Sequence, residues 1–152
     1  MRREELATDN LCYHCAGGKA SLVIEWGAKL TAELNPIYAK EIAKLRAAGR
    51  HVVQIRNFTG NAGLVAVRHL FSLTLNVAIE HGGTDIISAC APRSARGYRT
   101  FGFVDMLPDE PHREWDLAYD ALGKPLPTRL IRLAIDSIPP ETLAEWRKVQ
   151  ST

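Results

Sequence analysis

Several features of membrane, nucleic-acid-binding and secreted proteins are absent from this sequence. Its 152 residues contain no apolar run of about 18 residues, which a membrane-spanning helix needs. The first residues, Met-Arg-Arg-Glu-Glu, lack the apolar segment of a signal peptide. No run of lysine and arginine reaches about five residues, and the net charge is only +2. We therefore expect no nucleic acid as a partner and no membrane-spanning segment.

Cysteine is also scarce, and the count of three does not indicate a disulfide framework. We expect a reducing compartment, the cytoplasm. The motif Cys12-Tyr-His14-Cys15 has a spacing that could supply half of a zinc site. A structural zinc site needs four ligands, and Cys90 and the other histidines form no second pair. We therefore interpret the cysteines as core residues and expect no metal.

The rest of the composition, 46% hydrophobic and 24% charged, is that of an ordinary globular protein, and residues 1–152 fit one domain. Gly17 and Gly18 predict a hairpin turn between the first two strands, because glycine supplies the positive φ of a tight turn. Asn35-Pro36 is a strong helix start. The apolar patterns predict strands at Leu11–Ala16, Ser21–Trp26, His51–Phe58 and Ile86–Ala91, and helices from Asn35 to Gly49 and from Leu64 to about Glu80.

The last third of the chain begins with a proline-rich loop that starts at Leu107. The runs Glu114–Leu122 and Leu130–Asp136 are typical of extended strands around the turn Gly123–Pro127, although the first run also allows a helix. A terminal helix is predicted from Glu141 to Val149, with Trp146 packing it onto the core.

A glycine-containing turn, Asn57–Gly63, connects the strand His51–Phe58 to the long helix. In a strand–turn–helix unit, backbone N–H groups and the positive end of the helix dipole point at the turn and stabilise an anion there. A helix cap without a ligand is an equally good interpretation of the turn alone. Arg56 and Arg68 are alternative anion contacts, for which a solvated surface role is the other interpretation.

The stretch Asp85–Phe103 combines a buried strand, a short helix and a second extended run. Pro92 ends strand pairing because it lacks a backbone donor, and Arg93–Arg99 can form about two helical turns. Gly102 is placed to end that helix in a left-handed conformation. Tyr98 therefore lies on a helix that directly follows a buried strand, where it is either a proton donor or an amphipathic packing residue.

The ending Tyr98-Arg-Thr-Phe-Gly102-Phe103 resembles the Tyr-x-x-x-Gly-Phe end of the fourth helix in the GNAT superfamily of acyltransferases. Pro92 and the segment Leu-Arg-Ala-Ala-Gly-Arg-His-Val-Val-Gln-Ile-Arg-Asn-Phe, residues 45–58, are similar to the N-acyl amino acid synthases and the related autoinducer synthases. Asn57-Phe-Thr-Gly60-Asn-Ala62 is similar to the superfamily's phosphate-binding pattern Arg/Gln-x-x-Gly-x-Gly/Ala, with asparagine in the first place. The resemblance covers residues 11–136.

This resemblance implies an α+β fold in which helices flank a mixed twisted sheet of about six strands, with a shortened N-terminal part. It implies transfer of an acyl group from acyl-CoA or an acyl-carrier protein to a primary amine, for which an amino acid is one candidate. The acyl-phosphopantetheine donor is a co-substrate, and no permanently bound cofactor is expected. The donor would lie where the strands Val52–Phe58 and Ile86–Ala91 separate. The donor-binding residues that the resemblance implies are Asn57, Phe58, Thr59, Gly60, Asn61, Ala62, Gly63 and Arg68.

Acyl transfer from a thioester needs a group that protonates the leaving thiolate and a group that deprotonates the amine. Tyr98 is the candidate acid, as in the family. Glu25 is one candidate base, acting directly or through a water that Ser88 could orient. Cys90 has no histidine tied to it by spacing, so we interpret it as a core residue and not as a nucleophile.

The chain also departs from the family pattern. Gln54 and Asn57 stand where relatives often carry Glu and Arg, and Ala91 stands where an Asn is common. Barely ten residues precede the first predicted strand, in the region that relatives use for the acceptor pocket. The acceptor site is then open, or a second copy completes it in a homodimer, or catalysis has been lost. The rival hypothesis is a catalytically inactive GNAT-like module that binds an acyl thioester or a protein partner.

Overall fold

The fold is built on a mixed β-sheet with helices on both faces. The computed structural model describes residues 2–7, 10–15, 20–60, 64–109, 113–119 and 122–148. The strand order is β1-β2-β3-β4-β5-β8-β6, and β7 pairs with β8. Among the described strands, only β4 and β5 run parallel, and the other pairs are antiparallel. The strands are β1 (Arg2–Ala7), β2 (Asn10–Cys15), β3 (Ala20–Glu25), β4 (Val52–Gly60), β5 (Asp85–Cys90), β6 (Val104–Asp105), β7 (Arg113–Tyr119) and β8 (Pro125–Ala134).

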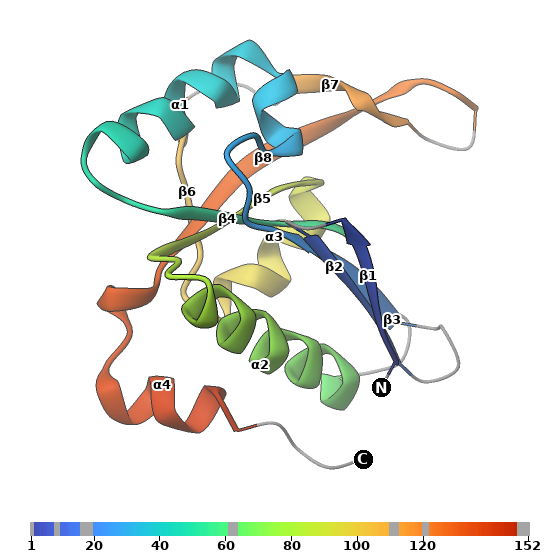
Figure 1. Ribbon diagram of the computed structural model, residues 1–152. Helices are drawn as coiled ribbons and strands as arrows, with labels where there is room; N and C mark the ends of the chain where they lie inside the picture. Colours follow the sequence, from blue (N-terminus) through green and yellow to red (C-terminus); the bar gives the residue numbers. More distant parts are fainter. Residues whose placement is uncertain are drawn as a thin grey trace.

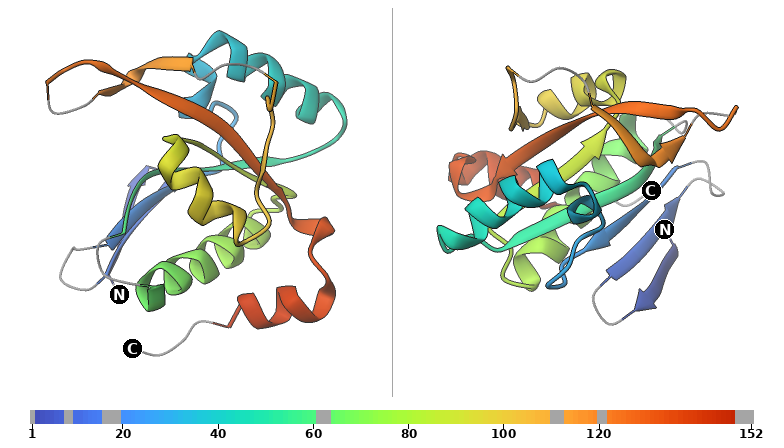
Figure 2. Two further views of the ribbon diagram at one scale, coloured as in Figure 1. Left: turned by 180° about the vertical axis from the view of Figure 1, so that it is seen from behind. Right: turned by 90° about the horizontal axis from the view of Figure 1, so that it is seen from above.

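The helices divide between the two faces of the sheet. Figure 1 shows α1 above the sheet and α2 with α4 below it, and Figure 2 shows α3 beside β8 from behind. The described helices are α1 (Pro36–Ala47), α2 (Leu64–Glu80), α3 (Pro92–Arg99) and α4 (Pro140–Trp146), with the short 3-10 helices η2 (Thr31–Leu34) and η3 (Ile135–Ser137). Within the described part of the chain, no helix is long and apolar enough to cross a membrane.

Local signals account for the helix boundaries. The Asn35 side chain accepts hydrogen bonds from the backbone N–H groups of Ile37 and Tyr38, and Pro36 occupies the first helical position of α1. These contacts satisfy donors that have no partner inside the helix. The end of α1 is marked by Gly49 at φ +81°, a left-handed conformation that glycine adopts without steric cost. The predicted start of this helix is confirmed.

Two apolar clusters, one on each face, hold the layers together. The larger cluster, which we call the α2-side core, joins the sheet to α2, α3 and α4; Leu70, Phe71, Leu75, Ile86 and Ile131 are among its buried members. The smaller cluster, the α1-side core, joins the sheet to η2 and α1 and includes Tyr38, Ile42, Val52, Ile87 and Leu130. Because side chains alternate along a strand, consecutive residues of β5 contribute to opposite cores.

The secondary structure confirms most of the sequence-based expectations. The predicted first hairpin is β2 paired with β3, and the predicted long helix is α2. The run that allowed either a strand or a helix is the strand β7, which pairs with β8. Trp146 of α4 packs edge-on against Phe71 and Phe101, as predicted. The strand β1 and the 3-10 helices η2 and η3 were not predicted. The strand β8 begins at Pro125, inside the predicted turn Gly123–Pro127, and it ends at Ala134, before the predicted end at Asp136. The side chains of Cys12, His14 and Cys15 lie outside the described residues, so the interpretation of that motif stays a prediction.

A charged network closes the end of the sheet at which β4 and β5 begin. The side chain of Asp85 is fully buried and accepts hydrogen bonds from Arg50 Nε at 2.6 Å, Thr84 Oγ1 at 2.6 Å and Arg132 Nε at 2.5 Å. The terminal nitrogens of Arg50 reach both oxygens of Asp136, at 2.7 and 2.9 Å. Burial acts to raise the pKa of Asp85, but the hydrogen bonds from Arg50, Thr84 and Arg132 outweigh it, so that pKa lies below its ordinary value.

We predict that Asp85→Asn lowers the free energy of unfolding by about 3 kcal/mol, because it leaves the partly buried Arg132 guanidinium without its anion and Arg50 with only the exposed Asp136. Chemical denaturation at neutral pH measures this loss. The matched control is Asp136→Asn, which removes an exposed carboxylate from the same network and should cost less.

The same network predicts a pH dependence of stability. A carboxyl whose pKa is lowered by folding stabilises the fold above the unfolded-state pKa of about 3.9, and this contribution is lost as the pH falls through the folded-state value. The wild-type free energy of unfolding should therefore fall more steeply below about pH 4 than that of Asp85→Asn. Parallel pH profiles for the two proteins would contradict this role of Asp85.

Candidate active site

The central strands β4 and β5 pair over only part of their length. Their parallel ladder runs from Val52↔Asp85 to Ile55↔Ser88 and then stops. Both strands nevertheless continue beyond this last pair. The point where the ladder stops is the vertex of a gap in the sheet, which we call the wedge.

Beyond the vertex, each strand stays with its outer neighbour. The strand β4 remains paired with β3 as far as Ala20↔Gly60, and β5 remains paired with β8 as far as Cys90↔Arg129. The sheet is therefore divided into two half-sheets on either side of the wedge. The strand edges that face each other across the wedge carry backbone N–H and C=O groups that the ladder no longer uses, and such groups need another partner.

Two of the predicted catalytic residues meet at the vertex. Ser88 belongs to the last pair of the ladder and is only 3% exposed. The hydroxyl oxygen of Tyr98 is buried on the same face of the sheet. Burial raises the pKa of the Tyr98 phenol, Cys90 raises it further, and hydrogen bonding with the Ser88 side chain partly offsets the rise. The phenol therefore stays protonated across neutral pH, which is the state that can donate a proton.

The orientation of Tyr98 follows from how α3 ends. Gly102 has φ +90°, in the left-handed conformation predicted from the sequence. The backbone N–H of Phe103 donates to the carbonyl of Tyr98 at 3.3 Å, which closes the helix end. The rings of Tyr98 and Phe103 meet edge to face with centroids 5.0 Å apart. The helix end and the aromatic contact together turn the Tyr98 hydroxyl toward β5.

Glu25 lies on the other face of the sheet. It pairs with Gln54 across β3 and β4, and the residues beside Gln54 on that face belong to the α1-side core. Its carboxylate accepts hydrogen bonds from the backbone N–H of Thr31 at 3.2 Å and from Thr31 Oγ1 at 2.8 Å, and it pairs with Arg56 Nε at 3.3 Å. The structure therefore places Glu25 and Tyr98 on opposite faces of the sheet. Both lie near the vertex of the wedge, where the β4–β5 ladder ends.

The predicted donor-binding turn is described only in part. Asn57, Phe58, Thr59 and Gly60 form the last part of β4, on the free side of the vertex. Asn61, Ala62 and Gly63 lie outside the described residues, as do the side chains of residues 57–60. The contact of this turn with a phosphate therefore stays a prediction.

Arg68, the alternative phosphate contact, is exposed on the second turn of α2. It lines a narrow groove between α2 and α4 together with Phe71, Phe101 and Trp146, among others. Arg68 lies four residues, about one helical turn, after the start of α2 at Leu64, and its contact with a phosphate stays a prediction.

Cys90 ends β5 beside the wedge. Burial raises the pKa of its thiol to about 12, and the Asp105 carboxylate contributes to the rise. A thiol in this state is a poor nucleophile because the thiolate is the reactive form. This agrees with the interpretation of Cys90 as a core residue.

Gln54 has a role that the sequence did not indicate. It is 1% exposed, and its side-chain carbonyl accepts a hydrogen bond from the backbone N–H of Ala32 at 2.9 Å. This bond attaches η2 to β4 one residue before the vertex. A polar residue within an apolar strand pattern was the available signal, but its partner, 22 residues away, could not be inferred from spacing.

A sheet that opens between its central parallel strands, with a tyrosine on the helix that follows the second of them, is the architecture of the GNAT acyltransferases. The family model described as N-acyl amino acid synthase FeeM matches residues 20–118. The chain belongs to this family.

Solved structures support the same fold. The structure of FeeM, an N-acyl amino acid synthase from uncultured soil microbes, is similar with a TM-score of 0.68 and 17% identity, over 93% of this chain and 73% of that chain. A mutant of the spermidine N-acetyltransferase SpeG from Vibrio cholerae is similar with a TM-score of 0.51 and 12% identity, over 93% and 69% of the two chains. An agmatine N-acetyltransferase mutant in its apo form gives 0.50 and 14%, over 76% and 68%. No curated protein sequence matches the chain.

We predict that Cys90 reacts with iodoacetamide at pH 8 more than about tenfold more slowly than a small free thiol, because little thiolate is present and the side chain is partly buried. Peptide mass mapping distinguishes Cys90 from the other cysteines, and the same reaction in denaturant provides the unfolded reference. Labelling of the folded protein at the unfolded rate would show that Cys90 is an accessible, activated thiol.

Proposed function

We propose that this protein is an N-acyltransferase that moves an acyl group from a thioester donor, acyl-CoA or an acyl-carrier protein, to a primary amine. The family match favours an amino acid as the acceptor. The observation that carries the proposal is the wedge, with Ser88 and the buried Tyr98 hydroxyl at its vertex. A cofactor is not needed, because the thioester itself is the activated donor.

In this proposal the pantetheine arm lies in the wedge along the free edge of β4. The amide groups of the pantetheine arm can hydrogen-bond to the backbone of β4 as an added strand would. The unpaired edge of β4 therefore positions the donor without a charged side chain. A backbone N–H of β4 beyond Ile55 polarises the thioester carbonyl, and the turn Asn57–Gly63 with Arg68 holds the phosphate end of the donor.

The chemistry then requires one proton to leave the amine and one to reach the sulfur. The amine attacks the thioester carbonyl carbon, the C–S bond breaks, and the Tyr98 phenol protonates the departing thiolate. Glu25 accepts the amine proton, directly or through water that Ser88 orients. Because Glu25 and Tyr98 lie on opposite faces of the sheet, the amine would enter from the α1 face and the thiolate would meet its acid on the α2 face.

The alternative is an inactive GNAT-like module that binds an acyl thioester or a protein partner. Thiol release from acyl-CoA, measured with a panel of amino acids, separates the two. Turnover supports the enzyme, whereas measurable binding of acyl-CoA without thiol release for any acceptor supports the binding module.

We predict that Tyr98→Phe lowers kcat by about a hundredfold while changing donor affinity by less than about twofold, because the hydroxyl acts on the leaving group and not on the bound donor. Thiol release and a direct binding measurement give the two quantities. An unchanged kcat would remove the acid role from Tyr98.

Tyr38→Phe is the matched control for this variant. The Tyr38 side chain is 1% exposed on the α1 face, and its hydroxyl lies 2.8 Å from Thr128 Oγ1. Its removal should cost about 1 kcal/mol of stability and leave kcat within about twofold of the wild type.

We predict that Glu25→Gln lowers kcat by about a hundredfold, and that the loss is smaller at higher pH, where more of the amine is already deprotonated. Thr31→Val is the matched variant, because it removes the hydroxyl donor at 2.8 Å but keeps the carboxylate. If Glu25 only fixes η2 against β3, the two variants should lose activity equally and in proportion to their loss of stability, which would exclude the base role.

A further inference from the structure

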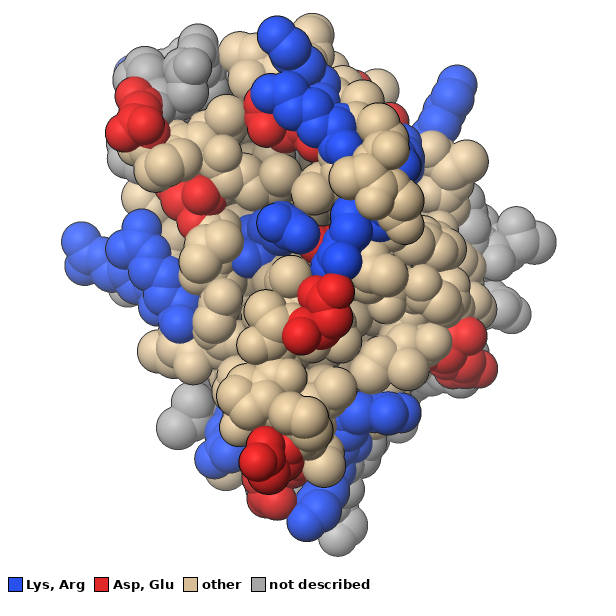
Figure 3. Space-filling model, turned by 90° about the vertical axis from the view of Figure 1, so that its left-hand side faces the viewer, with Lys and Arg blue, Asp and Glu red and all other residues tan. Residues whose placement is uncertain are grey.

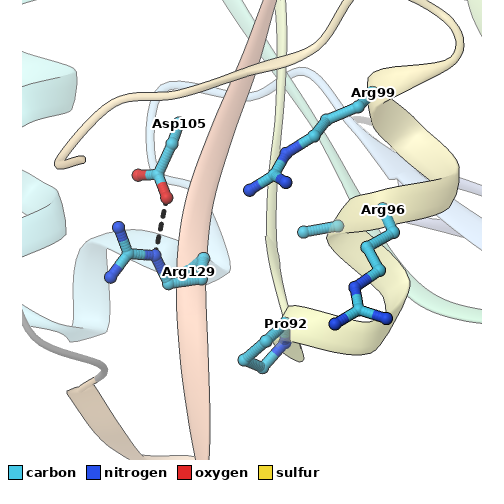
Figure 4. A pocket seen from close by; sticks show the side chains of 6 residues that line it. Pro92, Arg96, Arg99, Asp105 and Arg129 are labelled. Atoms are coloured by element: carbon cyan, nitrogen blue, oxygen red, sulfur yellow. Dashed lines mark hydrogen bonds and ion pairs between the residues drawn. The ribbon is translucent and has the colours of Figure 1, made fainter.

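A second candidate site lies outside the wedge. A hollow of about 320 Å³ is bounded by α3, β6 and β8, and its described lining consists of Pro92, Ala95, Arg96, Arg99, Asp105 and Arg129. None of these residues belongs to β4, so the hollow is distinct from the wedge. Figure 4 shows the arginines of α3 on one side of the hollow and the Asp105–Arg129 pair on the other.

The far wall of the hollow is held rigid. Arg129 Nε donates to Asp105 Oδ2 at 2.6 Å, and Arg129 Nη2 donates to the carbonyl of Leu107 at 2.9 Å. The other Asp105 oxygen accepts the backbone N–H of Leu107 at 2.9 Å. Both side chains are nearly buried, 13% and 12% exposed. The carboxylate is therefore committed to Arg129 and to the chain, and it does not neutralise the arginines opposite.

The α3 side of the hollow carries positive charge without a protein counter-ion. Arg96 and Arg99 are exposed, are three residues apart on one helix, and make no ion pair or side-chain hydrogen bond with any described residue. With three arginines and one aspartate, the lining carries a formal charge of +3 − 1 = +2. On the face shown in Figure 3, basic and acidic side chains are interspersed.

Stabilisation of the helix does not account for this arrangement by itself. Basic residues in the last turn of α3 stabilise the helix through its dipole, but lysine would do so equally well. This effect also does not explain why a third arginine, on β8, is fixed across the same hollow. Guanidinium groups are distinguished by their planar fork of donors, which binds carboxylate and phosphate oxygens in pairs.

We propose that this hollow binds the oxyanion group of a small molecule, a phosphate or a carboxylate, at a site separate from the wedge. Arg129, held by Asp105 and by the carbonyl of Leu107, forms the fixed wall, and Arg96 and Arg99 bind the anion from α3. The volume is at the lower end of ligand pockets, about 300 Å³ and above, so the bound group is small.

Titration of the full chain with inorganic phosphate, followed by the NMR signals of the arginine side chains, tests the proposal. We expect saturable shifts at Arg96, Arg99 and Arg129, and at least a tenfold weaker affinity in the Arg96→Ala/Arg99→Ala double variant. Arg99→Lys should keep helix stability yet weaken binding. Lys40→Ala removes an exposed charge on α1 and is the matched control, with unchanged affinity. Absence of saturable binding, or equal affinity in the double variant, would overturn the proposal.

Competition then identifies the source of the oxyanion. Displacement of phosphate by coenzyme A but not by pantetheine assigns the site to a donor phosphate, whereas displacement by an amino acid but not by its amide assigns it to an acceptor carboxylate. Because phosphate binding requires no turnover, its result is independent of whether Tyr98 and Glu25 catalyse acyl transfer.

Discussion

The short parallel ladder between β4 and β5 is the constraint on which the site depends. The two strands share four paired positions and then follow different partners, β3 on one side and β8 on the other. Beyond the last β4–β5 pair, each strand is thus paired along its outer edge and not with the other along its inner edge. The proposed donor has amide groups that could pair with those inner edges without any specialised side chain.

The alternation of side chains along β4 and β5 then assigns the polar residues of the wedge to opposite faces. Ser88 and the Tyr98 phenol face the α2-side core, and Glu25 with Arg56 faces α1. In the proposed reaction, one proton leaves the attacking amine and another reaches the leaving thiolate. The sheet would separate these two steps, with Glu25 on one face and Tyr98 on the other.

Features that depend on neighbours in the sequence could be predicted, and features that depend on distant partners could not. The Asn35 cap and the left-handed Gly102 each follow from residues within about one helical turn, and the length of α2 follows from the apolar pattern between Leu64 and Glu80. The contacts of Asp85 with Arg50 and Arg132 span 35 and 47 residues. Glu25 and Ser88 could be nominated by their types, but the faces on which they lie became known only with the pairing register of the sheet.

The Asp85 network lies at the closed end of the same pair of strands that parts to form the wedge. It ties the segment before β4, the start of β5, β8 and η3 into one rigid base. Beyond Ile55 and Ser88 no pair remains between the described residues of β4 and β5, so the spacing between the two half-sheets is fixed at this closed end alone. In the proposed reaction, a change in that spacing to fit a different acyl chain would break no backbone hydrogen bond between β4 and β5.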